Sequence, residues 1–195
     1  MPKPRSRVAE VLDDLRSGLL ELGVGWYLFG AQAALLYGAA RLTADVDVTV
    51  NLGELSMDAL VQSLRKWHFE PRIDDPEFLR KTRVVPVVHV PTQFPADLVL
   101  AGPGLEELFL ARAVEKDVAG VRILVARPED IVVMKILAGR DKDRADIDAV
   151  LSAQLSTIDL TMIRETLELL EQALDQRDLM PVFEQALRRI ESVTG

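Results

Sequence analysis

The sequence predicts a mixed α/β core over residues 1–127, followed by a C-terminal helical region over residues 128–195. Up to about residue 127, short apolar strand-like runs alternate with segments of helical periodicity, whereas from Pro128 onward the periodicity is helical only. Hydrophobic residues make up 49% of the chain and charged residues 28%, which is typical of globular proteins. A chain of 195 residues can form one core domain with a small helical appendage.

The elements of the core follow from apolar spacing and from capping and turn residues. Apolar residues at helical spacing predict a first helix that begins near Val8 and ends near Gly23. Ser56 is suited to cap a helix that ends near Trp67. The other predicted core elements are strands over 26–29, 45–50, 84–90, 96–100 and 121–125 and a helix over 31–38. Pro86 confines the strand 84–90 to a sheet edge or a bulge.

Four helices are predicted beyond the core. They cover residues 128–138, 143–153, 159–174 and 180–192.

Composition excludes several classes of protein. Because the chain has no cysteine, it has neither disulfides nor thiolate zinc ligands, and this fits a reducing compartment. A net charge of −8 argues against a broad nucleic-acid-binding surface, although a local basic groove is compatible with it. The N-terminus lacks the apolar segment of a signal peptide, and the longest apolar stretch, 27–40, is shorter than the roughly 20 residues that span a bilayer. We therefore expect a cytoplasmic protein with no membrane partner.

Two acids on one predicted strand are the first functional signal. In a strand over 45–50, Asp45 and Asp47 share one face and lie about 7 Å apart, so a cation beside them would relieve their repulsion. Asp97, on the strand 96–100, offers a third carboxylate. Such a trio suits Mg²⁺ and could hold two metal ions for in-line displacement at phosphorus. The alternative is that these acids cap strand ends or pair with Arg41 at the surface.

The turn at Gly30 is the second functional signal. A strand, a glycine turn and a helix in succession direct free backbone N–H groups at the space before the helix, which suits a phosphate. The glycines at 23, 25 and 30 do not have the G-x-G-x-x-G spacing, and the segment lacks the lysine and hydroxyl residue of a Walker loop. The pattern therefore indicates phosphate binding outside both of these motifs.

Taken together, "LFGAQAALLYGAARLTADVDVTV" (28–50) resembles the first motif of the polymerase-β-type nucleotidyltransferase superfamily, in which a glycine turn and helix precede an Asp-x-Asp strand. The likeness is closer to the AbiEii-type group, many of whose members are toxins of toxin–antitoxin pairs. Later matches are Asp97 in "ADLVL", Lys135 in "PEDIVVMKILAGR" and the segment "RDKDRAD" over 140–146. The resemblance covers roughly residues 26–151 and implies a mixed-sheet nucleotidyltransferase core.

The resemblance also implies a site and a reaction. It implies that Asp45, Asp47 and Asp97 hold two Mg²⁺ ions, with Mn²⁺ as an alternative, and that Asp97 activates the acceptor hydroxyl. It assigns the nucleotide and its phosphates to Gly30, Ala31, Arg41, Thr43, Lys135, Arg140, Lys142 and Asp143. The implied reaction moves a nucleoside monophosphate from an NTP to a hydroxyl or phosphate of an acceptor, such as tRNA, a protein or a small molecule, and releases pyrophosphate. An antitoxin protein is the implied partner.

Ala31 is a departure from the family pattern. The family usually has Gly or Ser there, so a hydroxyl contact to phosphate is lost while backbone N–H contacts survive. A catalytically silent nucleotide- or protein-binding module of the same fold is therefore the alternative function. A metal-dependent phosphohydrolase is a third interpretation, which has the acids but lacks clustered histidines.

Several single residues also have an ordinary structural explanation. Lys135 could only complement a helix dipole, and the charges of "RDKDRAD" could form a solvated helix face. Arg41 and Thr43 could order the turn before the strand, and His89 could be an ordinary packed strand residue.

Overall fold

The computed structural model describes residues 5–40, 43–73 and 75–194. The chain divides into two compact units, one of Met1–Gln32 with Thr43–Ala126 and one of Ala33–Leu42 with Arg127–Gly195. The first unit contains a mixed sheet with helices and the second is helical, so the predicted fold class is confirmed. The predicted division into 1–127 and 128–195 stays a prediction; in the structure, residues 33–42 group with the helical unit.

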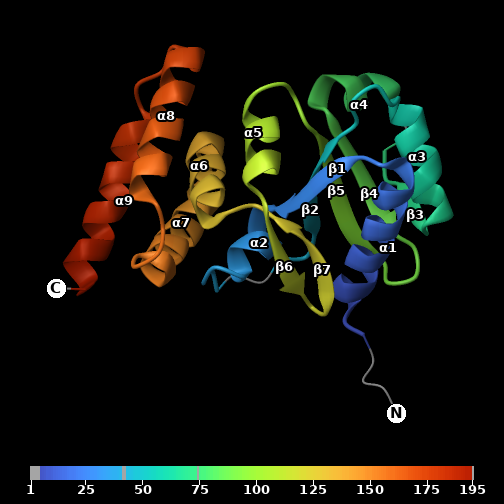
Figure 1. The fold of residues 1–195 in the computed structure, drawn as a ribbon, viewed down its shortest axis with the longest axis horizontal. Helices are drawn as coiled ribbons and strands as arrows, with labels where there is room; N and C mark the ends of the chain where they lie inside the picture. The colour runs from blue at the N-terminus through green and yellow to red at the C-terminus, as the bar shows by residue number, and fades with distance from the viewer. Residues whose placement is uncertain (1–4, 41–42, 74, 195) are drawn as a thin grey trace. The chain divides into compact units, whose positions relative to one another are not determined.

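The described part of the first unit contains a seven-stranded sheet. Its order is β3-β4-β5-β2-β1-β7-β6, with β2 parallel to β5, β1 parallel to β7, and the other neighbours antiparallel (Figure 1). The strands are β1 (Gly25–Phe29), β2 (Val46–Asn51), β3 (Phe69–Pro71), β4 (Val84–His89), β5 (Phe94–Leu100), β6 (Val114–Val118) and β7 (Val121–Val125).

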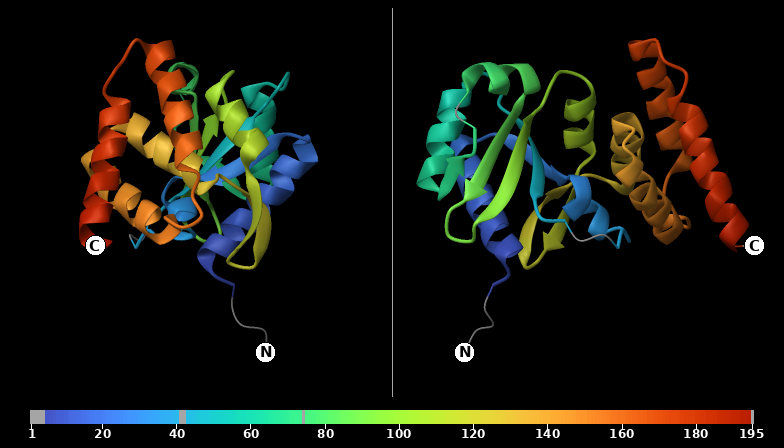
Figure 2. Two further views of the ribbon diagram at one scale, coloured as in Figure 1. Left: turned by 60° about the vertical axis from the view of Figure 1, so that its left-hand side comes forward. Right: turned by 180° about the vertical axis from the view of Figure 1, so that it is seen from behind.

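Helices α1 (Arg7–Leu22) and α3 (Met57–Lys66) lie side by side on one face of this sheet. Helix α3 begins after Ser56, as predicted, and the hydroxyl of this serine accepts a hydrogen bond from the backbone N–H of Ala59. The hydroxyl of Ser6, which was not predicted as a cap, accepts from the N–H of Ala9 at the start of α1. The hydroxyl of Ser63 on α3 donates to the carbonyl of Gly18 on α1 over 3.1 Å. In the right-hand view of Figure 2, strands β4 and β5 stand in front of α1, which shows that α1 covers the opposite face.

The register of β2 and β5 separates a buried face of the sheet from a polar one. Val46 and Val48 pair with Ala96 and Leu98, and all four side chains are buried. Alternation along the strands places Asp47 and its partner Asp97 on the other face. The predicted segregation of valines from acids along residues 45–50 is therefore what the structure shows.

The prediction that Pro86 confines its strand to a sheet edge or a bulge is wrong. Strand β4 lies between β3 and β5, and its register with β5 is unbroken from Val84 to His89. Pro86 is nevertheless compatible with this position. Its carbonyl accepts from the backbone N–H of Arg72, just beyond the last residue of β3, so its backbone faces the end of that short strand. The missing N–H of the proline therefore removes no hydrogen bond from the pairing of β4 with β5.

The second unit contains α6 (Pro128–Ala138), α7 (Asp141–Gln154), α8 (Leu160–Leu174) and α9 (Leu179–Thr194), which pack on one another. These four helices match the predicted ones to within about two residues at each end, which is the usual scatter of helix boundaries. Helix α2 (Gly30–Leu35) begins in the first unit and continues into the second. Elements that the sequence did not predict are β3, α4 (Pro76–Thr82), α5 (Leu105–Arg112) and β6.

Within the described residues, no helix combines the length and the apolar character needed to cross a bilayer.

Candidate active site

Three carboxylates predicted as metal ligands converge on the polar face of the first unit. Asp45 immediately precedes β2, Asp47 is its second residue, and Asp97 lies beside Asp47 on β5. Each of the three offers a carboxylate oxygen that lies within 4.8 Å of the other two, and all three side chains are partly exposed. Oxygen donors at this spacing suit a divalent cation such as Mg²⁺ or Mn²⁺.

Gly30 stands directly beside this cluster. Its φ is +67°, a left-handed conformation that glycine adopts readily, and it follows Phe29, the partner of Asp47 in the pairing of β1 with β2. A Cβ atom at residue 30 would overlap the Asp47 carboxylate, because it would lie 2.8 Å from Cγ of that side chain. The glycine therefore gives Asp47 the space in which to point toward the other two acids. The next residue, Ala31, is buried and opens the helix.

Two neighbours of the acids bind them directly. The guanidinium of Arg72, just after β3, donates from Nη2 to Oδ1 of Asp97, and the hydroxyl of Thr43 donates to Oδ1 of Asp45. Arg72 thus places a positive charge beside Asp97 and offsets part of the repulsion among the acids. Arg72 was not predicted as a site residue, because the strand before it has only three residues and therefore no periodic signal.

The second unit holds the predicted lysine in a buried ion-pair network. Nζ of Lys135 on α6 lies 3.2 Å from Oδ1 of Asp143 and 2.7 Å from Oδ2 of Asp146, both on α7. The Lys135 side chain is only 6% exposed. Its charge is therefore balanced within its own unit, and contact with a triphosphate stays a prediction.

The segment after α6 contributes the rest of this network. Nε of Arg140 lies 2.6 Å from Oδ2 of Asp143. Burial raises the pKa of the Asp143 carboxyl, but the hydrogen bond from Arg140 and the charge of Lys135 outweigh burial and lower this pKa below its usual range. Lys142 is exposed on the first turn of α7. The nucleotide-binding roles of Arg140, Lys142 and Asp143 also stay predictions.

Arg41, the remaining predicted phosphate ligand, lies outside the described residues.

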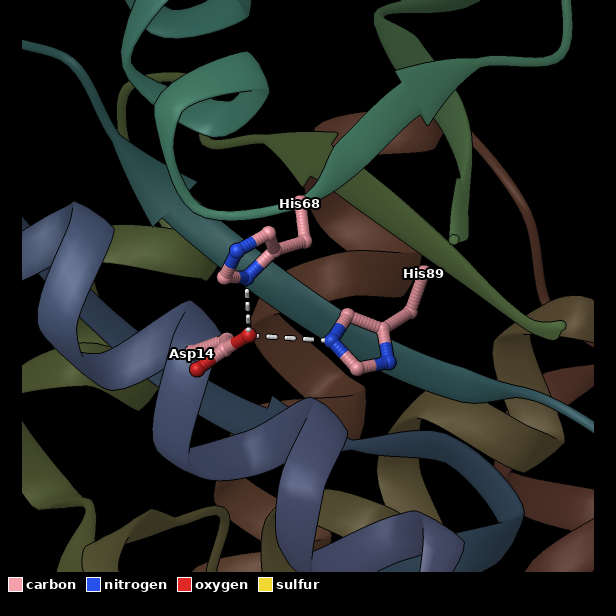
Figure 3. Close-up of side chains that lie close together, drawn as sticks. All are labelled: Asp14, His68 and His89. Carbon is pink, nitrogen blue, oxygen red and sulfur yellow. Dashed lines mark hydrogen bonds and ion pairs between the residues drawn. The ribbon is translucent and has the colours of Figure 1, made fainter. Parts of the chain in front are cut away.

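The two histidines of the chain are close together in space, although no motif in the sequence relates them. His68 and His89 both contact Asp14, on the sheet face that α1 covers (Figure 3). Asp97 pairs with Pro86, whereas His89 is three residues further along β4 and so points to the opposite face. The two histidines are therefore not part of the acidic cluster. A phosphohydrolase site that combines these histidines with the three acids gains no support from the structure.

Comparisons with solved structures show the same fold in three proteins. An antigenic nucleotidyltransferase-like protein from Paracoccidioides brasiliensis is 18% identical, with a TM-score of 0.54 over 92% of this chain and 94% of that one. The antibiotic-resistance factor ANT(2'')-Ia is 15% identical, with a TM-score of 0.57 over 87% and 95%. The lincosamide antibiotic adenylyltransferase LnuA, bound to lincomycin, is 11% identical, with a TM-score of 0.53 over 77% and 99%.

A family model described as "nucleotidyltransferase of unknown function (DUF6036)" matches residues 11–186, which include the three converging acids and both units of the chain. No curated protein sequence matches this chain. The expected superfamily is thereby shown, and the chain belongs to the DUF6036 family of nucleotidyltransferases.

Proposed function

We propose that the protein transfers a nucleoside monophosphate from an NTP to an acceptor hydroxyl or phosphate, with divalent metal ions held by Asp45, Asp47 and Asp97. One observation carries this proposal. In a chain of a nucleotidyltransferase family, three carboxylates separated by up to 52 positions, from Asp45 to Asp97, bring oxygen atoms within 4.8 Å of one another.

The residues present fit the metal ions that such a reaction needs. All three donors are carboxylates, which Mg²⁺ and Mn²⁺ accept, and Arg72 already supplies a compensating positive charge at Asp97. When bound, the ions would offset the charge that develops on the transferred phosphoryl group. Mg²⁺ is the ion we propose, with Mn²⁺ as its substitute.

The side chains of the site then have separate tasks. Asp97 accepts the proton of the acceptor hydroxyl, and Arg72, which donates to Oδ1 of this carboxylate, orients it. The acceptor oxygen forms a bond to the α-phosphorus while the bond between the α-phosphorus and the bridging oxygen breaks, and pyrophosphate leaves with that oxygen. Gly30 keeps Asp47 in place, and Thr43 orients Asp45.

The nucleotide contacts outside the acidic cluster rest on the family resemblance. We propose that the backbone N–H groups at Gly30 and Ala31 contact a phosphate, and that Arg41 and Thr43 lie along it. Lys135, with Arg140, Lys142 and Asp143, is proposed to meet the triphosphate. For Lys135 this requires that a phosphate compete with two buried aspartates for its ammonium group.

Three acceptor classes follow from the proposal. A small molecule is one, because the similar protein LnuA is a lincosamide antibiotic adenylyltransferase. RNA, including tRNA, and protein are the others, although the net charge of −8 disfavours an extended RNA-binding surface.

The decisive experiment incubates the protein with each α-labelled NTP, Mg²⁺ and a cell extract, and sorts labelled products into RNA, protein and small molecules. The matched variants are Asp47→Asn, which removes a metal ligand, and Glu54→Gln, the same kind of change at an exposed loop position. We expect label transfer by the parent and by Glu54→Gln, none by Asp47→Asn, and none for any of them in EDTA. Equal transfer by parent and Asp47→Asn would refute the metal role.

Nucleotide binding by a parent that transfers no label would instead identify the silent binding module. The AbiEii-type assignment and the toxin role are tested separately, by expressing the parent and Asp47→Asn in cells. If the protein is a toxin, expression of the parent should arrest growth and expression of Asp47→Asn should not. Co-expression of a neutralising antitoxin should relieve the arrest.

A further inference from the structure

The cluster of Asp14, His68 and His89 lies outside the proposed active site. Oδ2 of Asp14 is 2.9 Å from Nδ1 of His68 and 3.0 Å from Nε2 of His89, so two imidazole nitrogens point at one carboxylate oxygen (Figure 3). The three donor atoms all lie within 4.8 Å of one another. They come from α1, from the turn before β3 and from the last residue of β4.

We propose that Asp14, His68 and His89 bind one Zn²⁺ ion, on the sheet face opposite the acidic cluster. Two imidazoles and one carboxylate are a donor set that zinc accepts, whereas Mg²⁺ prefers oxygen ligands alone. Zinc bonds of about 2.1 Å in a tetrahedral site separate ligand atoms by roughly 3.4 Å. The distances from Oδ2 of Asp14 to Nδ1 of His68 and to Nε2 of His89 are shorter than this by about 0.4–0.5 Å. The Asp14 side chain is partly exposed and can move away from the histidines by that amount.

His89 is held in position for this role. Its side chain is 1% exposed, and its other ring nitrogen, Nδ1, lies 2.8 Å from the Thr92 hydroxyl. With Nε2 bound to zinc, Nδ1–H would donate to that hydroxyl, as the second nitrogen of a zinc-bound histidine usually does to a nearby oxygen. The ring also packs 5.0 Å, centroid to centroid, from Phe69. The buried ligand is therefore oriented before any metal arrives.

His68 lies on the solvent-exposed side of the proposed zinc site. Its side chain is 60% exposed, so water or another ligand can reach the fourth coordination position. Its φ is +68°, uncommon for a residue with a Cβ atom, and its carbonyl accepts from the N–H of Val90 over 2.8 Å. The turn that carries His68 is thereby tied to the end of β4, next to His89.

The composition of the chain makes the proposal unusually easy to test. Histidine occurs twice and cysteine not at all, so both histidines of the protein belong to this cluster and no thiolate competes for zinc. Untagged full-length protein is used, with Mg²⁺ in excess to occupy the acidic cluster. Zn²⁺ binding is measured by calorimetry, and Co²⁺ is the optical probe, because its visible absorption reports the ligand geometry.

We expect one Zn²⁺ per chain, a rise in melting temperature on adding Zn²⁺, and Co²⁺ absorption that Zn²⁺ abolishes. His68→Asn should weaken Zn²⁺ binding by at least about tenfold, since ligand-sphere changes have effects of that size. Asparagine tolerates the left-handed backbone and the side chain is exposed, so the variant should fold. Asp14→Asn should act similarly, whereas Asp13→Asn, its neighbour on α1, should bind like the parent.

Zinc affinity that is unchanged by His68→Asn would overturn the proposal, as would a parent that binds no zinc at tens of micromolar protein. Binding lost with Asp47→Asn but kept by His68→Asn would place the ion at the acidic cluster and equally refute the site.

Discussion

Asp47 and Asp97 are direct partners across the parallel pair of β2 and β5. Side chains opposite each other on neighbouring strands are held close by the backbone, and like charges in that position destabilise a sheet. Asp45 adds a third carboxylate to this pair, and Arg72 forms an ion pair with Asp97. A divalent cation held by the three carboxylates would therefore stabilise the sheet further.

Arg72→Met should make the stability of the protein depend more strongly on a divalent ion. The change removes the positive charge at Asp97, a partly exposed pair, so in EDTA the free energy of unfolding should fall by about 0.5–1 kcal/mol. Mg²⁺ should restore more stability to the variant than to the parent. Thermal unfolding with and without Mg²⁺ measures both. Arg65→Met, which breaks an exposed pair with Glu70, is the control and should show no such metal dependence.

Gly30→Ala should abolish transfer because its methyl group would displace the Asp47 carboxylate. The matched control is Gly23→Ala, where φ is +66° but a Cβ atom would meet nothing within 4 Å. Both variants incur the cost of a left-handed alanine, about 1–2 kcal/mol. Only Gly30→Ala should lose additional stability and all NMP transfer, measured by denaturant unfolding and by label transfer. If Gly30→Ala and Gly23→Ala have the same stability and the same transfer activity, the space beside the Asp47 carboxylate is not what the reaction requires of Gly30.

Lys135→Met should destabilise the helical unit strongly. The variant leaves the buried Asp146 carboxylate without its 2.7 Å partner, and breaking a buried pair typically costs about 3–5 kcal/mol. Adding Asp146→Asn should recover much of this loss, because Asp143 keeps Arg140. The NTP dissociation constant of the rescued double variant then isolates the phosphate role: tenfold or weaker binding supports it, and unchanged affinity removes Lys135 from the nucleotide site.

Tyr37→Phe should change the alkaline unfolding of the protein. Burial, with a contribution from the negative charge of Glu129, raises the pKa of Tyr37 to about 12. Because the folded state keeps the phenol neutral, its stabilising effect is complete below the unfolded pKa of about 10 and is lost as the pH rises toward 12. The parent should therefore lose more unfolding free energy than Tyr37→Phe between pH 9 and pH 11.5. Parallel pH profiles for the two proteins would contradict this.

The sequence predicted the acidic cluster because the signals that define it are local. Alternation in "ADVDVTV" and "ADLVL" assigns the acids to a face, and the glycine at position 30 marks the turn beside them. Their register with each other is not local, since it depends on pairing between strands far apart in the chain. The sequence therefore offered Asp97 as a candidate third acid, and the family resemblance added a match at that position, but only the structure shows the pairing of Asp97 with Asp47.

The contacts that the sequence did not predict join residues of different elements. Arg72 follows a strand of three residues, and Asp14, His68 and His89 come from three elements with no common motif. Lys135 was correctly placed on a helix over 128–138, but its two acidic partners belong to the next helix, α7. Helix periodicity defines a face; it does not define what a neighbouring helix brings to that face.

The parallel pairing of β2 with β5 also has a kinetic consequence. The pairings on either side of it, β1 with β2 and β4 with β5, join strands that are closer in sequence, and β2 and β5 form the seam between these two pairs. Asp47 and Asp97, 50 positions apart by subtraction of their numbers, meet only when this seam closes, and closing such a long loop is slow. An unfolded chain therefore has no cluster with which to capture Mg²⁺. If β2 pairs with β5 only after the folding transition state, Mg²⁺ should slow unfolding and leave the refolding rate unchanged. Stopped-flow measurements of both rates, with and without Mg²⁺, therefore show whether this pairing forms before or after the transition state.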